Sequence, residues 1–340
     1  MIGSLRNKRL PGGTPTVQHG RGLLGLTRVL FLFLALSFYL RASAQNLELG
    51  PDTHLVFTGV EDAKRILATR DDYLVNMTPF DREIRMKTNG EVSESEFVAF
   101  LTNSVRAWSA ADSNRLTRVL SNVTVKLAPW HLPFPSTIQL IKTDGREEFG
   151  FYYTRQNAVV FPATAIRGTG SDIVLHELFH VLSRQNPALR TNLYKILGFT
   201  RINDIPIPAG LEQHQVLNPD GVENGWLITV TNRGTALPVV PSLYVPANMS
   251  PDKLGNPLDY FRLMVVTNVA NSWKPVVVSG QPRMLRIGEV TGYYEQIGSN
   301  TDYLIHPDEI LAENFVQLIN GKTNVPTPRI LKEMERLFLK

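Results

Sequence analysis

The order of hydrophobic and polar positions divides the chain into a helical first part, a β-rich middle and a helical end. Between residues 45 and 129 the spacing is mostly that of helices. From Ser136 onward it changes to the alternation typical of strands. The helices predicted in the first part are 61–70, 93–108 and 112–120. We therefore expect an N-terminal helical region followed by a mixed region of strands and helices.

Three short apolar runs predict strands after this helical region. They span 137–142, 149–154 and 158–161. The first two flank a turn that contains Asp144 and Gly145, a pair typical of tight turns. An exposed strand edge beside the following helix would be able to hold an extended peptide by main-chain pairing. An ordinary sheet strand explains the same pattern equally well.

Residues 171–184 predict a helix that is apolar nearly all round, with Ser171 suited to cap its start and Pro187 opening the next helix. Its apolar members are Ile173, Val174, Leu175, Leu178, Phe179, Val181 and Leu182. Residues 205–300 contain many prolines and glycines between short apolar runs, which indicates β-hairpins and long loops. A further helix is predicted from Pro307.

Composition narrows the class of protein. The chain has 340 residues, of which 43% are hydrophobic, so it is able to bury a sizeable core. It contains no cysteine, which excludes disulfides, a cysteine nucleophile and cysteine metal ligands. Six of the 35 Lys and Arg residues lie in residues 1–44, which contain no Asp or Glu, so the remainder carries 29 basic and 31 acidic side chains. This near-neutral body gives no electrostatic basis for nucleic-acid binding.

Residues 1–44 have the pattern of a secretory leader. A basic segment precedes the apolar run 29–40, and Ala42-Ser43-Ala44 forms an A-x-A-like cleavage site. The run is short for a bilayer span, which needs about 20 residues. We expect a secreted or periplasmic protein cleaved after Ala44, and an uncleaved membrane anchor is the alternative.

The candidate chemistry concentrates in residues 176–180, which have the pattern H-E-x-x-H. Helical spacing places His176 and His180 one turn apart on one face, so that both imidazoles can reach one cation. Glu177 lies about 100° round the helix, where it is able to take a proton from a metal-bound water. Three ionisable groups in so apolar a helix are costly unless they are paired or metal-bound, which argues against a chance match.

Two histidines leave a catalytic zinc site incomplete, because such a site usually has three protein ligands. The best candidates for the third are Glu309 and Glu313, one turn apart on the helix that Pro307 begins. Two neighbouring carboxylates would repel each other unless a cation or a histidine N–H lies between them. The other residues that remain open as ligands are Glu212, His214 and Asp220.

H-E-x-x-H followed by E-x-x-A-[DE]-N, here residues 309–314, resembles the gluzincin group of zinc metallopeptidases, which includes thermolysin and neprilysin. The resemblance covers these two motifs only. It implies a zincin-like core with Glu309 as the third zinc ligand and Glu313 as the acid that orients His176. Glu313 stands where Asp is commoner in that group, so it stays open as an alternative ligand.

Peptide hydrolysis also needs a hydrogen-bond donor for the oxyanion of its tetrahedral intermediate. The gluzincin group supplies a Tyr or a His near the zinc. Tyr303 and His306 are our candidates, ahead of Tyr293 and Tyr294. Each tyrosine is also suited to core packing, and His306 to capping its helix.

These observations predict an α+β fold whose zincin-like core sets a mixed β-sheet beside the helix with the H-E-x-x-H motif. The expected divisions are a leader at 1–44, an N-terminal helical region at 45–130, and a metallopeptidase domain at 131–340 with a β-rich insertion at about 205–300. The sequence does not decide whether the region at 45–130 is a lobe of the mature protein or a propeptide.

We expect an exported zinc-dependent metallopeptidase that hydrolyses peptide bonds in a peptide or protein substrate. Glu177 is its expected catalytic residue, and His176, His180 and Glu309 are its expected Zn²⁺ ligands, although this set would also suit Fe(II). One alternative is a secreted binding or structural protein that retains a non-catalytic zincin-like metal site. A hydrolase of non-peptide amides is another. No nucleic-acid partner is expected, and a membrane partner only if the leader is uncleaved.

Overall fold

The computed structural model describes residues 47–339, except 208–214, 246–248, 251–252 and 254–256. The expected leader and its cleavage site lie outside the described residues. Among the residues that are described, no helix is long and apolar enough to cross a membrane. This part of the chain is α+β, with several sheets as well as helices, and it belongs to one compact unit.

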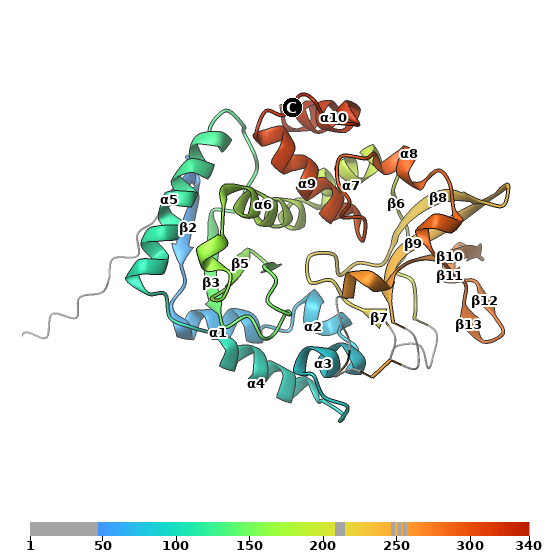
Figure 1. Cartoon of the computed structure of the whole chain (residues 1–340), viewed down its shortest axis with the longest axis horizontal. Helices are drawn as coiled ribbons and strands as arrows, with labels where there is room; N and C mark the ends of the chain where they lie inside the picture. The colour runs from blue at the N-terminus through green and yellow to red at the C-terminus, as the bar shows by residue number, and fades with distance from the viewer. Residues whose placement is uncertain (1–46, 208–214, 246–248, 251–252, 254–256, 340) are drawn as a thin grey trace, which may run out of the picture. The chain divides into compact units, whose positions relative to one another are not determined.

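The first sheet has five strands in the order β1-β2-β3-β5-β4 (Figure 1). The strands are β1 (Leu47–Gly50), β2 (Thr53–Phe57), β3 (Thr137–Thr143), β4 (Tyr153–Arg155) and β5 (Ala158–Pro162). The strands β2, β3 and β5 are parallel, while β1 and β4 are antiparallel edge strands. The strands on either side of Asp144 and Gly145 do not pair with each other, because β5 lies between them.

Helices connect β2 to β3, because parallel neighbours need a long crossover. They are α1 (Val60–Ala68), α2 (Asp72–Asn76), α3 (Pro79–Met86), α4 (Glu94–Ser104) and α5 (Ala110–Leu127). The helices predicted from sequence correspond to α1, α4 and α5, whereas α2 and α3 are too short to show a helical period. The region at 45–130 is therefore mostly helical but also contributes β1 and β2 to the first sheet.

The second sheet lies mostly in the range where hairpins and loops were expected. Its path is β11-β10-β9-β8-β6, with β14 paired to β10 and β7 to β9, and its pairs are antiparallel. The strands are β6 (Thr200–Arg201), β7 (Gln215–Val216), β8 (Trp226–Asn232), β9 (Thr235–Tyr244), β10 (Phe261–Val269), β11 (Ser272–Pro275) and β14 (Met284–Leu285), and β12 (Val277–Val278) pairs separately with β13 (Gln281–Pro282). Arg233 and Gly234 close the β8–β9 hairpin with φ values of 49° and 80°, as a two-residue turn of this type requires.

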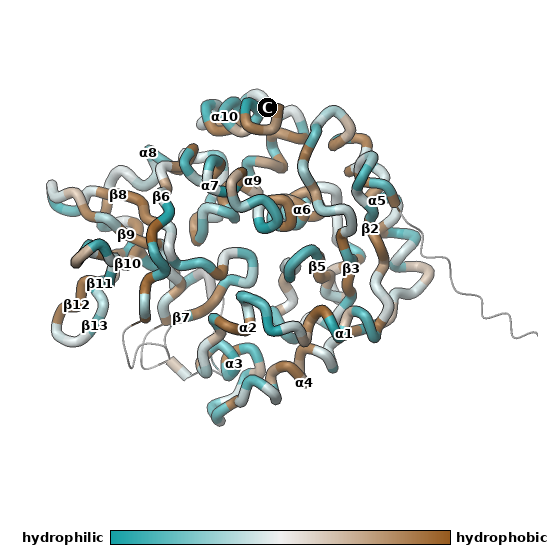
Figure 2. The backbone as a smooth tube through the Cα atoms, turned by 180° about the vertical axis from the view of Figure 1, so that it is seen from behind, coloured by the Kyte–Doolittle hydropathy of each residue, from teal (hydrophilic) through white to brown (hydrophobic). Residues whose placement is uncertain are grey.

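The helix α6 (Ser171–Gln185) lies within the main hydrophobic core and packs against α5, α9, β4 and β5. The other helices are α7 (Pro187–Ile196), α8 (Tyr293–Ile297), α9 (Pro307–Ile319) and α10 (Pro328–Phe338). The Phe315 ring of α9 lies 5.4 Å from the Phe179 ring of α6, centroid to centroid. Figure 2 shows the hydrophobic residues along α6, which this packing buries. Gly170 occupies the N-cap position of α6, so the expectation that Ser171 caps it is wrong.

Candidate metal centre

Two helices bring three possible ligands together. On α6, His176 and His180 lie one turn apart with ring centroids separated by 4.7 Å. On α9, Glu309 places Oε2 at 3.1 Å from His176 Nε2 and at 3.4 Å from His180 Nε2. The three ligand atoms lie within 4.8 Å of one another, so the group is able to bind a metal ion.

The burial of these groups fits a metal site. His180 and Glu309 are buried, and the side chain of His176 is 14% exposed. The buried atoms His180 Nε2 and Glu177 Oε2 have no hydrogen-bond partner in the described structure. Buried polar atoms without a partner are costly in a folded protein. Two imidazoles and one carboxylate are a usual donor set for zinc, which would satisfy His180 Nε2.

The electrostatics reflect how closely these charges are packed. Burial alone would lower the pKa of His176, but its hydrogen bonds with Glu309 and Glu313 outweigh burial and raise the pKa to about 10. Burial alone would raise the pKa of Glu309, but the neighbouring imidazoles hold that pKa well below its usual range. These pKa shifts favour the Glu309 carboxylate as an anion and the His176 imidazole as a cation, and a metal ion would have to displace the proton from Nε2, because a ligating histidine is neutral.

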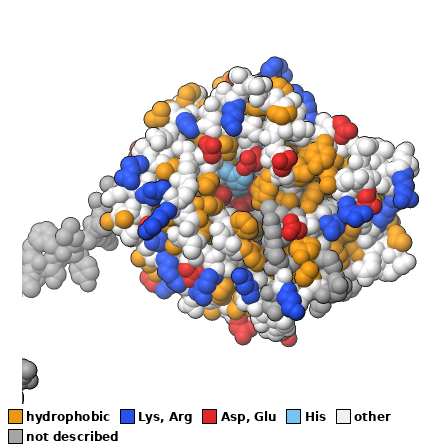
Figure 3. All heavy atoms as spheres, viewed as in Figure 1, with side chains coloured by type: hydrophobic (Ala, Val, Ile, Leu, Met, Phe, Trp, Pro, Cys, Tyr) orange, Lys and Arg blue, Asp and Glu red, His pale blue; other side chains and the backbone are white. Residues whose placement is uncertain are grey.

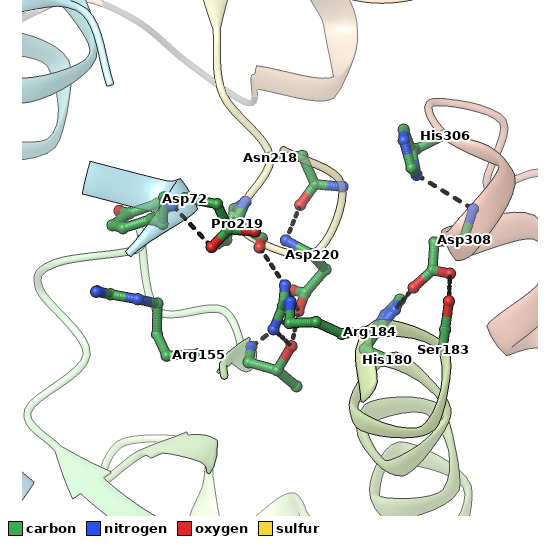
Figure 4. Close-up of polar contacts among 12 residues, drawn as sticks. Asp72, Arg155, His180, Ser183, Arg184, Asn218, Pro219, Asp220, His306 and Asp308 are labelled. Atoms are coloured by element: carbon green, nitrogen blue, oxygen red, sulfur yellow. Dashed lines mark hydrogen bonds and ion pairs between the residues drawn. The ribbon is translucent and has the colours of Figure 1, made fainter. Parts of the chain in front are cut away.

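Each histidine has an acid on its other ring nitrogen. Glu313 Oε1 lies 2.9 Å from His176 Nδ1, and Asp308 Oδ2 lies 2.6 Å from His180 Nδ1. The other oxygen of Asp308 accepts a hydrogen bond from the Ser183 hydroxyl (Figure 4). It also accepts one from the Tyr194 hydroxyl at 2.7 Å. Such partners fix the orientation of ligating imidazoles. The sequence offered Asp308 only as a first-turn acid of its helix, so its role at His180 was missed.

Glu177 occupies a different position from the three possible ligands. It is buried, and burial followed by the nearby charge of Asp220 raises its pKa to about 8. Glu177, His180 and Asp220 form a second group whose ligand atoms lie within 4.8 Å of one another. Asp220 Oδ1 accepts hydrogen bonds from the backbone N–H of Thr154 at 2.9 Å and from its hydroxyl. Arg184 lies beside Asp220 in the same cluster (Figure 4).

Two cavities meet at Glu177. The first has a volume of about 170 Å³, and the second has a volume of about 270 Å³. His176, Glu177 and Tyr152 line both cavities. The apolar side chains of the first cavity include Phe149, Val216, Leu243 and Ile305. Figure 3 shows histidine side chains in a hollow bordered by acidic and hydrophobic side chains.

The two candidate oxyanion donors lie in different surroundings. Tyr303 lines the first cavity, and its ring centroid is 6.2 Å from that of His176. His306 is the N-cap of α9, where its Nδ1 accepts the backbone N–H of Asp308 at 3.2 Å, and it does not line either cavity. Tyr293 donates to the Leu304 carbonyl at 2.9 Å, also away from the cavities.

The remaining candidate ligands divide into two groups. Glu212 and His214 lie outside the described residues. Asp220 is near Glu177 and His180 but does not belong to the group formed by His176, His180 and Glu309. Glu313 contacts His176 only at Nδ1, the nitrogen directed away from Glu309.

No protein-family model, no curated protein and no solved structure matches the chain.

Proposed function

We propose that the protein is a zinc-dependent metallopeptidase with a zincin-like, gluzincin-type core. The observation that carries this proposal is the convergence of His176 Nε2, His180 Nε2 and Glu309 Oε2 beside Glu177, whose buried Oε2 has no hydrogen-bond partner among the described residues. His176, His180 and Glu309 would hold the ion. Export with cleavage after Ala44 belongs to the same proposal and rests on the sequence alone.

The first sheet supports a peptide as the substrate. Its edge strand β4 packs against α6, and Tyr152, the residue before β4, lines both cavities. An edge strand is able to pair with an extended peptide through main-chain hydrogen bonds, and at β4 such a peptide would have to displace Asp220 Oδ1 from the backbone N–H of Thr154. The two cavities share Tyr152, His176 and Glu177, so a chain bound at Glu177 would be able to extend into both.

A bound zinc ion would supply Lewis-acid polarisation of the carbonyl and a lowered pKa of water. Glu177 takes a proton from the attacking water and delivers it to the leaving amine. Burial raises the pKa of Tyr303, so its phenol stays protonated and is able to donate a hydrogen bond to the developing oxyanion. Asp308 and Glu313 hold the two imidazoles in orientation through their Nδ1 atoms.

The test compares the wild type with Glu177→Gln for zinc content and for hydrolysis of casein and a peptide library. Glu147→Gln is the matched control, because Glu147 is also a buried glutamate but lines neither cavity. We expect all three proteins to hold one zinc ion, and Glu177→Gln alone to lose about 10²–10⁴-fold in kcat/KM.

Two results would contradict the proposal. Equal hydrolysis by the wild type and Glu177→Gln would remove Glu177 as the base. A wild type that holds zinc but cleaves no peptide would favour the alternative, a secreted binding protein with a non-catalytic metal site.

A further inference from the structure

The loop between β7 and β8 brings an amide side chain to Glu309. Asn218 Nδ2 donates a hydrogen bond of 2.8 Å to Glu309 Oε1, while Oε2 is the oxygen that lies near the imidazoles. Asn218 Oδ1 accepts a hydrogen bond of 3.1 Å from the backbone N–H of Asp220. Both ends of the amide are therefore held, and the Glu309 carboxylate is turned so that Oε2 faces His176 and His180.

Helix α3, in the N-terminal helical region, holds the residue that precedes Asn218. Asp81 Oδ1 accepts a hydrogen bond of 2.8 Å from the backbone N–H of Leu217, and Arg85 Nη2 donates one of 2.8 Å to the Leu217 carbonyl. Asp81 and Arg85 also form an ion pair of 2.9 Å, and both side chains are 1% exposed. Moving either side chain away would leave the other charge buried and uncompensated, so the two side chains are held in place. Because both also bind the backbone of Leu217, they fix that backbone as well.

Arg85 also reaches a second wall of the first cavity. Its Nε donates a hydrogen bond of 2.7 Å to Glu148 Oε1, which in turn accepts one from the Tyr73 hydroxyl. Arg85, Glu148 and Leu217 all line this cavity. One buried guanidinium in the N-terminal helical region thus connects two separate segments of the wall around the metal centre.

We propose that Asn218 is a positioning residue for Glu309, and that the Asp81–Arg85 pair of α3 holds Asn218 in place. The N-terminal helical region is then a permanent part of the metal site and not a propeptide. This inference rests on the proposed function in one respect, namely that Glu309 is a zinc ligand. None of the three side chains Asn218, Asp81 and Arg85 belongs to the two sequence motifs, and α3 is separated from α9 by most of the chain.

Two variants of the whole protein test this inference. Asn218→Ala removes the donor to Glu309, and Arg85→Met removes the hydrogen bond to the Leu217 carbonyl. Arg155→Met is the matched control, because Arg155 is also 1% exposed, pairs with Asp71 at 2.7 Å and lies over the same Tyr73 ring. The hydrogen bonds of Arg155 go to Asp71 and Thr69, not to the loop.

Three quantities are measured: the Kd for zinc by competition with a chromophoric chelator, the absorption spectrum with Co²⁺, and the Tm of the metal-free protein. We expect Asn218→Ala and Arg85→Met to weaken zinc binding about 10–100-fold and to change the Co²⁺ spectrum. Arg155→Met is expected to lower the Tm while it keeps the wild-type zinc affinity and Co²⁺ spectrum.

Wild-type zinc affinity together with an unchanged Co²⁺ spectrum in Asn218→Ala would overturn the inference. This variant changes a half-buried side chain, so it provides the test even if Arg85→Met does not fold. A wild type that binds no zinc would contradict the proposed function instead, so the two failures are distinguishable.

Discussion

Glu309 and Glu313 lie one turn apart on α9 but have different surroundings. The side chain of Glu309 is 3% exposed and lies near the Nε2 atoms of both histidines. The side chain of Glu313 is 40% exposed and contacts only His176 Nδ1. The sequence placed both acids on one face of a helix, but it does not contain the ring orientation that decides which imidazole nitrogen each acid meets.

This difference predicts the effects of two matched substitutions. Glu309→Gln removes an anionic ligand, whereas Glu313→Gln removes a partner that orients His176 and is expected to weaken zinc binding about 10–100-fold. Glu309→Gln should weaken zinc binding more than Glu313→Gln does. The measurement is the zinc Kd of each variant by chelator competition, and a larger loss in Glu313→Gln would exchange the two roles.

Glu147 predicts a pH dependence of stability that is separate from the metal centre. It is fully buried, its Oε2 has no hydrogen-bond partner in the described structure, and burial raises its pKa, to which the charge of Glu148 adds. The carboxyl group of Glu147 therefore holds its proton more tightly in the folded protein than in the unfolded chain. The contribution of Glu147 to stability is full below the unfolded pKa of about 4.3 and is lost as pH rises through the raised pKa.

Glu147→Gln should remove this loss. We expect the free energy of unfolding of the variant to exceed that of the wild type only slightly near pH 4. The difference should increase as pH rises. This difference in the free energy of unfolding increases by at most about 1.4 kcal/mol per pH unit. Urea unfolding of the metal-free proteins between pH 4 and pH 8 measures it, and a difference that does not change with pH would contradict the assignment.

At the level of elements, α9 does most to organise the site. It supplies Glu309, and it supplies Asp308 and Glu313, the acids at the two Nδ1 atoms. His306 caps the start of this helix through its Nδ1. Capping explains the position of His306, whereas Tyr303 lines the cavity in which an oxyanion would form.

Substitutions at these two positions should therefore have different effects. His306→Ala is expected to lower the free energy of unfolding by about 1 kcal/mol, and His306→Asn to restore most of it, because asparagine is also a favourable N-cap. Tyr303→Phe is expected to lower kcat with little effect on stability. The checks are urea unfolding and the kcat of zinc-loaded protein, and a fall in kcat for His306→Asn equal to that for Tyr303→Phe would make His306 the donor.

The sequence predicts some elements well, but length does not decide which: α5 was predicted only over 112–120, and α10 was not predicted. The helix predicted at 171–184 lies close to the bounds of α6, α9 begins at Pro307 as predicted, and the apolar run at 158–161 becomes β5. The short strands β1 and β2 were missed, because each includes polar residues and shows too little alternation to identify it, whereas the equally short β5 begins with four consecutive apolar residues and ends at Pro162. The pairing of β3 and β4 with β5 was also not foreseen, since partner choice in a sheet depends on contacts between distant segments.

At the scale of the whole molecule, the site depends on contacts that no local pattern contains. The H-E-x-x-H motif identified His176 and His180, but between His180 and Glu309 the chain forms most of the second sheet. The packing of α6 on α9 through Phe179 and Phe315 closes this separation. Asn218 and Arg85 were not foreseen because hydrogen bonds from two further segments define their roles.

Crystals grown with zinc, with diffraction recorded on both sides of the zinc absorption edge, would locate the ion itself. We expect a single anomalous peak bonded to His176 Nε2, His180 Nε2 and Glu309, each at about 2.0–2.2 Å. An absence of any peak among these three side chains in zinc-saturated crystals, or an ion bound by other residues, would contradict the proposed metal centre.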